Sequence, residues 1–168
     1  PIPSAADVTN RAIVLSGLSK TYGLPGLRTG WLIIRDPEVR AHFMNWKFYT
    51  SICPPAPSEF LATAAMRVWE DLRDRNIAQI EHNLQLADAF FARWPDLFTW
   101  RRPAAGSTAL VGYNVPSVTA VSESLANEAG VLIHPGVTLG SDDQHMRMGF
   151  GRSAFGEALE KFEAWLQQ

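Results

Sequence analysis

Short apolar runs mark the first part of the chain. Residues 12–16 (AIVLS) and 31–34 (WLII) are nearly all apolar, which is typical of strands buried on both faces of a parallel sheet. The segment between them contains four glycines and a proline, so we predict a loop over residues 16–30. Asp36 can cap a helix and Pro37 suits a first helical turn, which predicts a helix that runs to about residue 49.

A long helical pattern follows. The segment 53–57 (CPPAP) predicts a stiff, irregular connection, after which Ser58 can cap a helical stretch that reaches residue 94. Steps of three and four residues place one apolar stripe on this stretch, at Ile77, Ile80, Leu84, Ala87 and Phe91. Because the stretch is too long for one ordinary globular helix, we expect a bend or break near residues 73–76.

The remaining residues follow an α+β pattern, and we place a domain boundary between residues 1–74 and 75–168. The predicted elements are strands over residues 108–113, 131–134 and 145–150, a helix over residues 118–129 that ends at Gly130, and a closing helix over residues 155–166.

Composition narrows the classes of protein that fit. The chain has 168 residues, 46% of them apolar, which suits one globular domain or two small lobes. A net charge of −2 without a basic block argues against nucleic acid as a partner. No apolar run approaches the roughly 20 residues that span a bilayer, and no signal peptide is visible. The single cysteine, Cys53, excludes a disulfide framework and a cysteine-based metal site, and we expect a cytoplasmic protein.

Candidate chemistry concentrates in residues 16–31, SGLSKTYGLPGLRTGW. Lys20 follows the first predicted strand in a glycine-rich loop, with the hydroxyls of Ser16 and Ser19 near it and Arg28 eight residues later. Glycines allow close backbone approach to an anion, and an arginine binds phosphate with two parallel hydrogen bonds. A partly buried lysine beside another cation has a lowered pKa and is a better nucleophile. Taken alone, the pattern fits either a covalent site for a phosphate-bearing aldehyde or an ordinary solvated lysine.

The same segment resembles the cofactor-lysine signature of the class I/II aminotransferases, the fold-type I enzymes that use pyridoxal 5'-phosphate (PLP). The matching residues are Ser19-Lys20, Tyr22-Gly23, Leu24-Pro25-Gly26-Leu27-Arg28 and Gly30-Trp31. The resemblance implies that Lys20 is the catalytic Schiff-base residue and that Arg28 holds the cofactor phosphate, with further contacts from Ser19 and Ser16. Many members carry a serine three residues before the lysine, where this chain has Gly17.

A second match lies near the C-terminus. In a strand over residues 145–150, Met146 and Met148 point to one face and Arg147 to the other. An arginine isolated on such a face fits either an anion clamp or a surface ion pair. The family carries a substrate-carboxylate arginine in this context, so the resemblance implies that Arg147 binds the substrate.

The resemblance implies an α/β fold, and specifically the C-terminal part of a PLP-dependent transferase-like fold. A remnant of the large-domain parallel sheet would lie in residues 1–74, and the small α+β domain in residues 75–168. The implied activity is transfer of an amino group from an amino acid to a 2-oxo acid. Other fold-type I reactions, by a cyclase, lyase or decarboxylase, and a non-catalytic self-associating domain are the alternatives. The stretch over residues 46–62 looks closest to bacterial members that act on free amino acids, some of them cyclases.

Other residues are assigned to packing. We expect His134 and His145 in packing or supporting roles, Cys53 as a small buried residue, and the six tryptophans in the core. The chain starts at Pro1, and the family's residues that contact the pyridine ring precede the cofactor lysine by more than this chain holds. We therefore expect a truncated or cleaved protein with exposed sheet edges and apolar faces. Such a chain would form a homodimer or pair with an N-terminal half.

Overall fold

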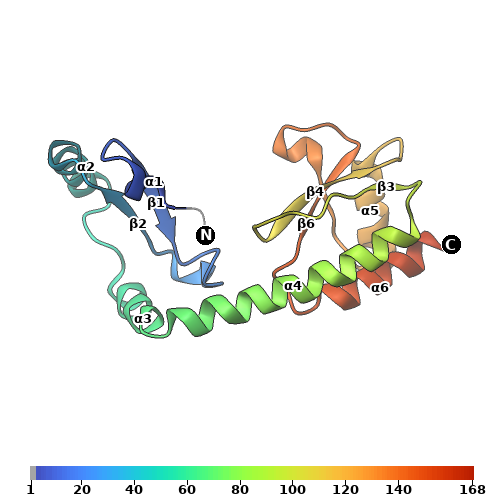
Figure 1. The fold of residues 1–168 in the computed structure, drawn as a ribbon. Helices are drawn as coiled ribbons and strands as arrows, with labels where there is room; N and C mark the ends of the chain where they lie inside the picture. The colour runs from blue at the N-terminus through green and yellow to red at the C-terminus, as the bar shows by residue number, and fades with distance from the viewer. Residues whose placement is uncertain (1–2) are drawn as a thin grey trace. The chain divides into compact units, whose positions relative to one another are not determined.

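The computed structural model describes residues 3–168 and divides the chain into two compact units, Pro1–Asn76 and Ile77–Gln168. The division falls within one helix, α4 (Trp69–Arg93), which is drawn in green in Figure 1. Because α4 is continuous, the break expected near residues 73–76 is wrong. The chain turns instead at the two residues between Met66, the last residue of α3, and Trp69. No helix among residues 3–168 combines the length and the apolar character needed to cross a bilayer.

The first unit contains a two-stranded sheet with helices before and after it. Its elements are α1 (Ala5–Val8), β1 (Ile13–Gly17), the 3₁₀ helix η1 (Pro25–Leu27), β2 (Gly30–Ile34), α2 (Pro37–Thr50) and α3 (Ala56–Met66). β1 and β2 pair antiparallel, from Ile13 opposite Ile34 to Gly17 opposite Gly30. The connection between the two strands, residues 18–29, therefore begins and ends at one end of the ribbon.

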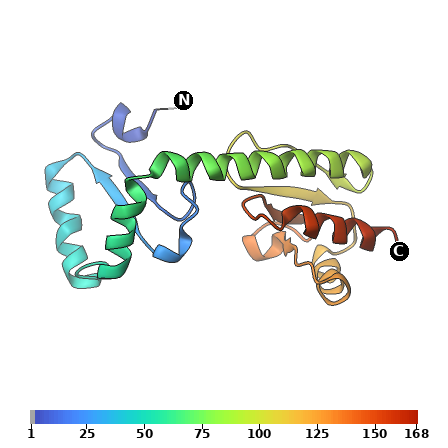
Figure 2. The ribbon, with the colours of Figure 1, turned by 90° about the horizontal axis from the view of Figure 1, so that it is seen from below.

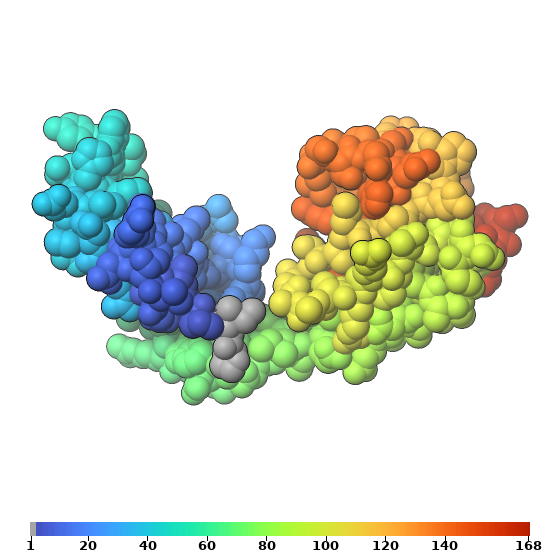
Figure 3. All heavy atoms as spheres, turned by 45° about the horizontal axis from the view of Figure 1, so that its top comes forward, coloured from blue at the N-terminus to red at the C-terminus, as the bar shows by residue number. Residues whose placement is uncertain are grey.

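Two expectations about these strands are wrong for the described residues. The strands pair antiparallel rather than parallel, because a connection of a dozen residues without a crossover helix returns the chain directly alongside itself. They are also not buried on both faces, since 78% of Leu15 and 44% of Leu32 is exposed. The expectation of exposed apolar faces is confirmed, and it extends to α2, in which no residue is buried. Figure 3 shows these segments in blue and cyan at the surface of the first unit.

Of the two predicted helix starts, that of α2 is confirmed and that of α3 is wrong. Asp36 caps α2 as expected, because its carboxylate accepts hydrogen bonds from the backbone N–H groups of Glu38 (2.9 Å) and Val39 (3.1 Å). Ser58 does not cap α3, which begins two residues earlier, since the fixed backbone angle of proline is tolerated in a first helical turn. Cys53 precedes this start and is exposed, so its expected burial is wrong.

The second unit packs a four-stranded antiparallel sheet against helices. The strands are β3 (Phe98–Thr99), β4 (Thr108–Tyr113), β5 (His134–Pro135) and β6 (His145–Gly149), in the order β3-β4-β6-β5, with α5 (Val118–Ala129), the 3₁₀ helix η2 (Gly136–Leu139) and α6 (Phe155–Leu166). The predicted bounds of β4, α5 and α6 are confirmed, and Gly130 ends α5 in the left-handed conformation. The strand expected over residues 131–134 is reduced to His134–Pro135, and β3 was not predicted because two residues carry no periodicity.

Aromatic side chains hold the core of this unit together. α4 and α6 lie side by side (Figures 1 and 2). The rings of Phe90 and Phe162 stack between them, with their centroids 5.6 Å apart. A salt bridge of 2.5 Å joins Arg93 to Glu163. Of the predicted helical stripe, Leu84, Ala87 and Phe91 are buried, whereas Ile77 is 56% exposed.

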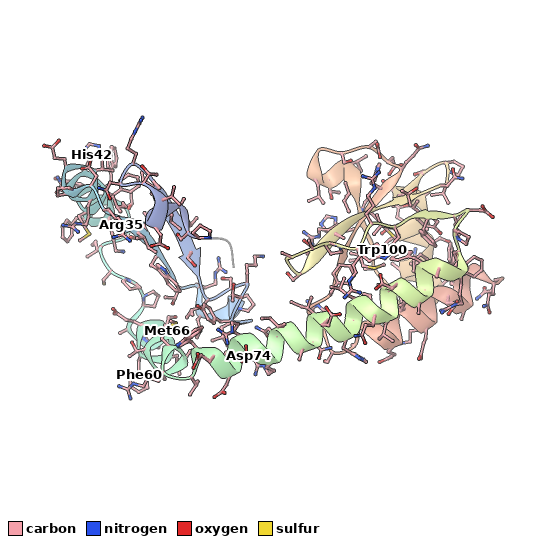
Figure 4. All side chains as sticks on the ribbon, in the orientation of Figure 1. Arg35, His42, Phe60, Met66, Asp74 and Trp100 are labelled. Carbon is pink, nitrogen blue, oxygen red and sulfur yellow. The ribbon has the colours of Figure 1, made fainter. Side chains whose placement is uncertain are left out.

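The expectation that the tryptophans belong to the core is confirmed for three of the six, since Trp94, Trp100 and Trp165 are partly buried and pack against the core cluster. None of the six is fully buried, because indole N–H groups need polar partners at the edge of the packing. Trp100, labelled in Figure 4, is an example: its Nε1 donates to the Asp88 carboxylate at 2.7 Å. Trp46 on α2 is 61% exposed.

Candidate functional site

Lys20 lies in the connection between β1 and β2, at a tight turn closed by backbone hydrogen bonds. The N–H of Gly23 donates to the carbonyl of Lys20 at 3.0 Å, and the N–H of Leu24 donates to the carbonyl of Leu18 at 2.9 Å. Leu18 is 1% exposed and also donates to the carbonyl of Thr29 at 3.1 Å. The buried Leu18 side chain and these bonds fix the backbone on both sides of Lys20.

The Lys20 side chain is exposed, which corrects the expectation of partial burial. No residue in the range 3–168 forms a hydrogen bond or salt bridge with its amine. The two other lysines both have partners, since Lys47 donates to the Ser51 hydroxyl at 3.2 Å and Lys161 pairs with Glu157 at 2.7 Å. Lys20 therefore presents an exposed amine that no other described residue binds.

Arg28 lies in the same loop, directly after η1. Its backbone is left-handed (φ 53°), and its Nη1 donates to the carbonyl of Pro25 at 3.1 Å. The other guanidinium N–H groups have no acceptor in the described part of the chain, and they are available to an anion. The loop thus carries both Lys20 and Arg28, as the sequence predicts. A hydrogen-bonded turn follows Lys20, and the 3₁₀ helix η1 leads directly into Arg28.

Ser19 and Ser16 differ in their positions. Ser19 is half-buried beside Lys20, whereas Ser16 is exposed on β1, opposite Trp31 of β2. A Cβ at Gly17 would lie 3.0 Å from the carbonyl oxygen of Thr29 and 3.1 Å from Cα of Gly30, which is a tight fit. The two strands approach closely at Gly17 and Gly30, and a side chain at position 17 would shift the facing backbone slightly.

Asn76 is a site residue that sequence reasoning missed. It lies on α4, and its Nδ2 donates to the carbonyl of Thr21, next to Lys20, at 3.0 Å. A single asparagine 55 residues from the loop belongs to no motif and carries no periodic signal. The crowding at this turn appears only in the structure, where a Cβ on Gly23 would lie 2.5 Å from Nδ2 of Asn76.

Arg147 lies in the second unit, on β6. The predicted alternation is confirmed, because Met146 and Met148 are buried and Arg147 is exposed. On the neighbouring strands it pairs with Leu110 and His134. It forms no salt bridge with any residue of the described range, so the alternative of a surface ion pair has no support.

The two histidines near Arg147 have hydrogen-bonded side chains. The Oγ1 of Thr138 donates to the carbonyl of Pro135 at 2.8 Å and therefore accepts from Nδ1 of His134 at 2.7 Å. Nδ1 of His145 lies 2.5 Å from the Asp142 carboxylate, and this hydrogen bond lowers the pKa of Asp142. Supporting roles for both histidines stay a prediction.

The donor set of the Lys20 loop fits one side of a PLP molecule. A free amine condenses with an aldehyde, and a guanidinium with unused N–H groups binds phosphate. The loop has no Asp or Glu between Gly17 and Gly30, so it offers no acidic partner for a pyridine nitrogen. The loop can therefore hold the aldehyde and the phosphate, and the ring nitrogen needs residues from elsewhere.

Comparison with known proteins agrees with this donor set. The family described as "Aminotransferase class I and II" matches residues 2–158. Capreomycidine synthase from Streptomyces vinaceus is 28% identical over 151 residues, which cover 89% of this chain and 38% of that protein. The chain thus spans well under half the length of this relative.

Solved structures give the same result. A PLP-dependent aminotransferase from Streptococcus suis matches with a TM-score of 0.90 and 31% identity, over 99% of this chain and 44% of that one. The PLP-dependent cyclase OrfR matches with a TM-score of 0.84 and 26% identity, over 96% of this chain and 44% of that one. Both structures share the mixed α/β fold expected for the C-terminal portion of a fold-type I enzyme. Together with the family match over nearly the whole chain, they show that this chain belongs to the class I and II aminotransferases.

Proposed function

We propose that this chain is the C-terminal portion of a PLP-dependent aminotransferase and binds the cofactor covalently through Lys20. The observation that carries the proposal is that one hydrogen-bonded loop between β1 and β2 holds both the Lys20 amine, which has no partner among residues 3–168, and the Arg28 guanidinium, which uses only Nη1 there. A transferase of this kind moves an amino group from an amino acid to a 2-oxo acid.

Each residue has a role that follows from its chemistry. Lys20 would hold the cofactor covalently, through its amine at the cofactor's aldehyde carbon. Arg28 binds the phosphate, assisted by Ser19 and, at the end of β1, Ser16. Bound PLP supplies an electron sink for negative charge that develops on the substrate α-carbon. With PLP bound, the Lys20 amine would accept and return the proton at the substrate α-carbon, and Arg147 would bind the substrate carboxylate.

A cyclase reaction on the same cofactor is the second candidate. It is favoured by one specific observation: a capreomycidine synthase and a PLP-dependent cyclase are among the similar proteins, at 28% and 26% identity. Both reactions begin with the same covalent attachment at Lys20, so both need the same loop.

The exposed apolar residues of the first unit support association with more polypeptide. Leu15 on β1, Tyr49 on α2 and Phe60 on α3 are 78%, 90% and 75% exposed, and Phe60 is labelled in Figure 4. The chain covers 44% of the solved relatives, so the segment that these relatives have in addition is the partner we propose. Sedimentation of the purified protein tests this, and a discrete homodimer would favour a second copy instead.

Labelling of the lysines tests the covalent site. The protein is mixed with PLP, reduced with borohydride, digested, and analysed by mass spectrometry for the pyridoxyl group on each of its three lysines. We expect label on Lys20 well above Lys47 and Lys161. Lys20→Ala should remove the visible absorbance of the adduct, and the matched control Lys47→Ala should keep it. Equal labelling of all three lysines would refute the covalent site.

The reaction type needs a separate measurement. Amino acids that convert the lysine-bound cofactor to its amine form, with release of a 2-oxo acid, support transamination. Release of a cyclic product without that conversion supports the cyclase. If Lys20 is labelled and no amino acid changes the absorbance, the chain holds the cofactor without completing the reaction.

A further inference from the structure

We propose that Asn76 is a positioning residue that sets the backbone of the Lys20 turn from outside the loop. The inference rests on the proposed role of Lys20. Asn76 is the last residue of the first unit and lies on α4, whereas the turn belongs to the connection between β1 and β2. Nothing in the family signature around Lys20 includes it.

The Asn76 amide both donates a hydrogen bond to the Lys20 turn and fills the space beside it. Nδ2 of Asn76 donates to the carbonyl of Thr21 at 3.0 Å, so the amide holds the peptide group one residue after Lys20. Two residues further on, the same amide occupies the space beside Gly23. A Cβ on Gly23 would lie 2.5 Å from Nδ2 and 2.8 Å from Oδ1 of Asn76, closer than any real Cβ contact.

Gly23 is required for a second reason. Its φ of +66° is a backbone conformation that residues with a side chain rarely adopt. The turn therefore combines a left-handed glycine, the bond from the Gly23 N–H to the Lys20 carbonyl at 3.0 Å, and the half-buried amide of Asn76 packed against it. Since the Lys20 side chain itself has no partner among residues 3–168, the direction of its Cα–Cβ bond depends on this backbone.

Asn76 would affect how well ordered the Lys20 turn is before the cofactor binds. A turn that samples several conformations presents the Lys20 amine correctly only part of the time, and the apparent affinity for PLP falls by that fraction. Asn76 reduces this cost by holding the Thr21 carbonyl. It touches neither the amine nor the phosphate site, so its effect passes through the backbone of residues 20–23.

Two substitutions separate the hydrogen bond that the Asn76 amide donates from the space that it fills beside Gly23. Asn76→Ala removes both the hydrogen bond and the bulk beside Gly23. Asn76→Asp keeps the bulk but places a carboxylate oxygen against the Thr21 carbonyl. Asn114 offers a matched control in the second unit, because its Nδ2 also donates to a backbone carbonyl, that of Asp96, at 3.3 Å.

The experiment measures selective labelling by PLP. Loss of a hydrogen bond of this kind is expected to slow the labelling of Lys20 by roughly three- to tenfold in both Asn76 variants. Labelling of Lys47 and Lys161 stays unchanged, and Asn114→Ala matches the wild type. Equal rates at Lys20 in the wild type and Asn76→Ala would overturn the proposal, as would an equal slowing at all three lysines. If Asn76→Asp behaves as the wild type, the amide acts as a filler and the donor role is wrong.

Hydrogen exchange without cofactor provides a second readout, which does not depend on the covalent site. The amides of Gly23 and Leu24 are hydrogen-bonded within the turn, so their exchange should accelerate in Asn76→Ala by roughly the same factor. Unchanged exchange at these two amides would overturn the positioning role. If the wild type fails to label Lys20 but exchange accelerates in the variant, Asn76 orders the turn and the proposed function alone is wrong.

Discussion

The side chain of Asn83 on α4 donates to the carbonyl oxygen of Phe150, at 2.8 Å, just beyond the end of β6. The same Nδ2 also donates to the carbonyl of Arg152 at 2.7 Å, and Asn83 is 1% exposed. One buried amide therefore satisfies two backbone groups at the end of the strand that carries Arg147. It joins α4 to the end of β6 by a buried polar contact beside the apolar core.

Removal of this amide should destabilise the second unit. Asn83→Leu removes the donor to the Phe150 carbonyl and leaves the Arg152 carbonyl with only the Phe155 N–H at 3.3 Å, so we expect the free energy of unfolding to fall by about 1–3 kcal/mol. Urea denaturation measures the change. The control is Asn127→Ala on the exposed face of α5, which should change stability by less than about 0.5 kcal/mol. A loss of that small size in Asn83→Leu would show that water replaces the amide.

Arg147→Gln should separate binding from stability. Arg147 is exposed without a salt bridge in the described range, so the free energy of unfolding should change by less than about 0.5 kcal/mol. If Arg147 binds the substrate carboxylate, affinity for amino acids should fall roughly ten- to hundredfold. The spectral response of PLP-loaded protein to a panel of amino acids measures this. Arg152→Gln is the control, and equal weakening in both variants contradicts a specific clamp.

Alkaline pH should destabilise the protein through Tyr113. Burial raises the pKa of Tyr113 from 10.0 to about 12, because the phenolate would be desolvated. The unfolded chain therefore loses this proton at lower pH than the folded one. The stabilisation is fully present below pH 10 and is lost as pH rises towards 12. Tyr113→Phe should flatten the decline between these values, measured by urea denaturation. Tyr49→Phe, at a side chain that is 90% exposed, should keep the wild-type profile.

Gly30→Ala should disturb the pairing of β1 and β2. A Cβ at this position would lie 2.8 Å from the carbonyl oxygen of Ser16, a backbone atom of the facing strand β1 that cannot move without shifting the strand. We expect a loss of about 1–3 kcal/mol in the free energy of unfolding. Gly26→Ala is the matched control, since a Cβ there meets nothing within 4 Å. Equal stability of the two variants would mean that the strands separate without cost.

Elements with strong local signals were predicted from the sequence. The helix α5 shows this, because Ser117 caps its start, apolar residues follow its inner face and Gly130 ends it. Asp36 and Pro37 likewise determine where α2 begins. Such signals act within a few residues, and a single sequence contains all of them. The strand β5 has two residues and no periodicity, so only its pairing with β6 defines it.

The sequence by itself determined the family, the loop that carries Lys20 and Arg28, and the alternation that exposes Arg147. These features depend on residue type at close spacing. Only the tertiary structure decided that β1 and β2 pair antiparallel, that Lys20 is exposed, and that the amides of Asn76 and Asn83 hold carbonyls 55 and 67 residues away in the chain. The physical reason is that such contacts depend on where distant backbone segments meet. An asparagine amide can bind any backbone carbonyl, so the sequence does not indicate which carbonyl it will contact.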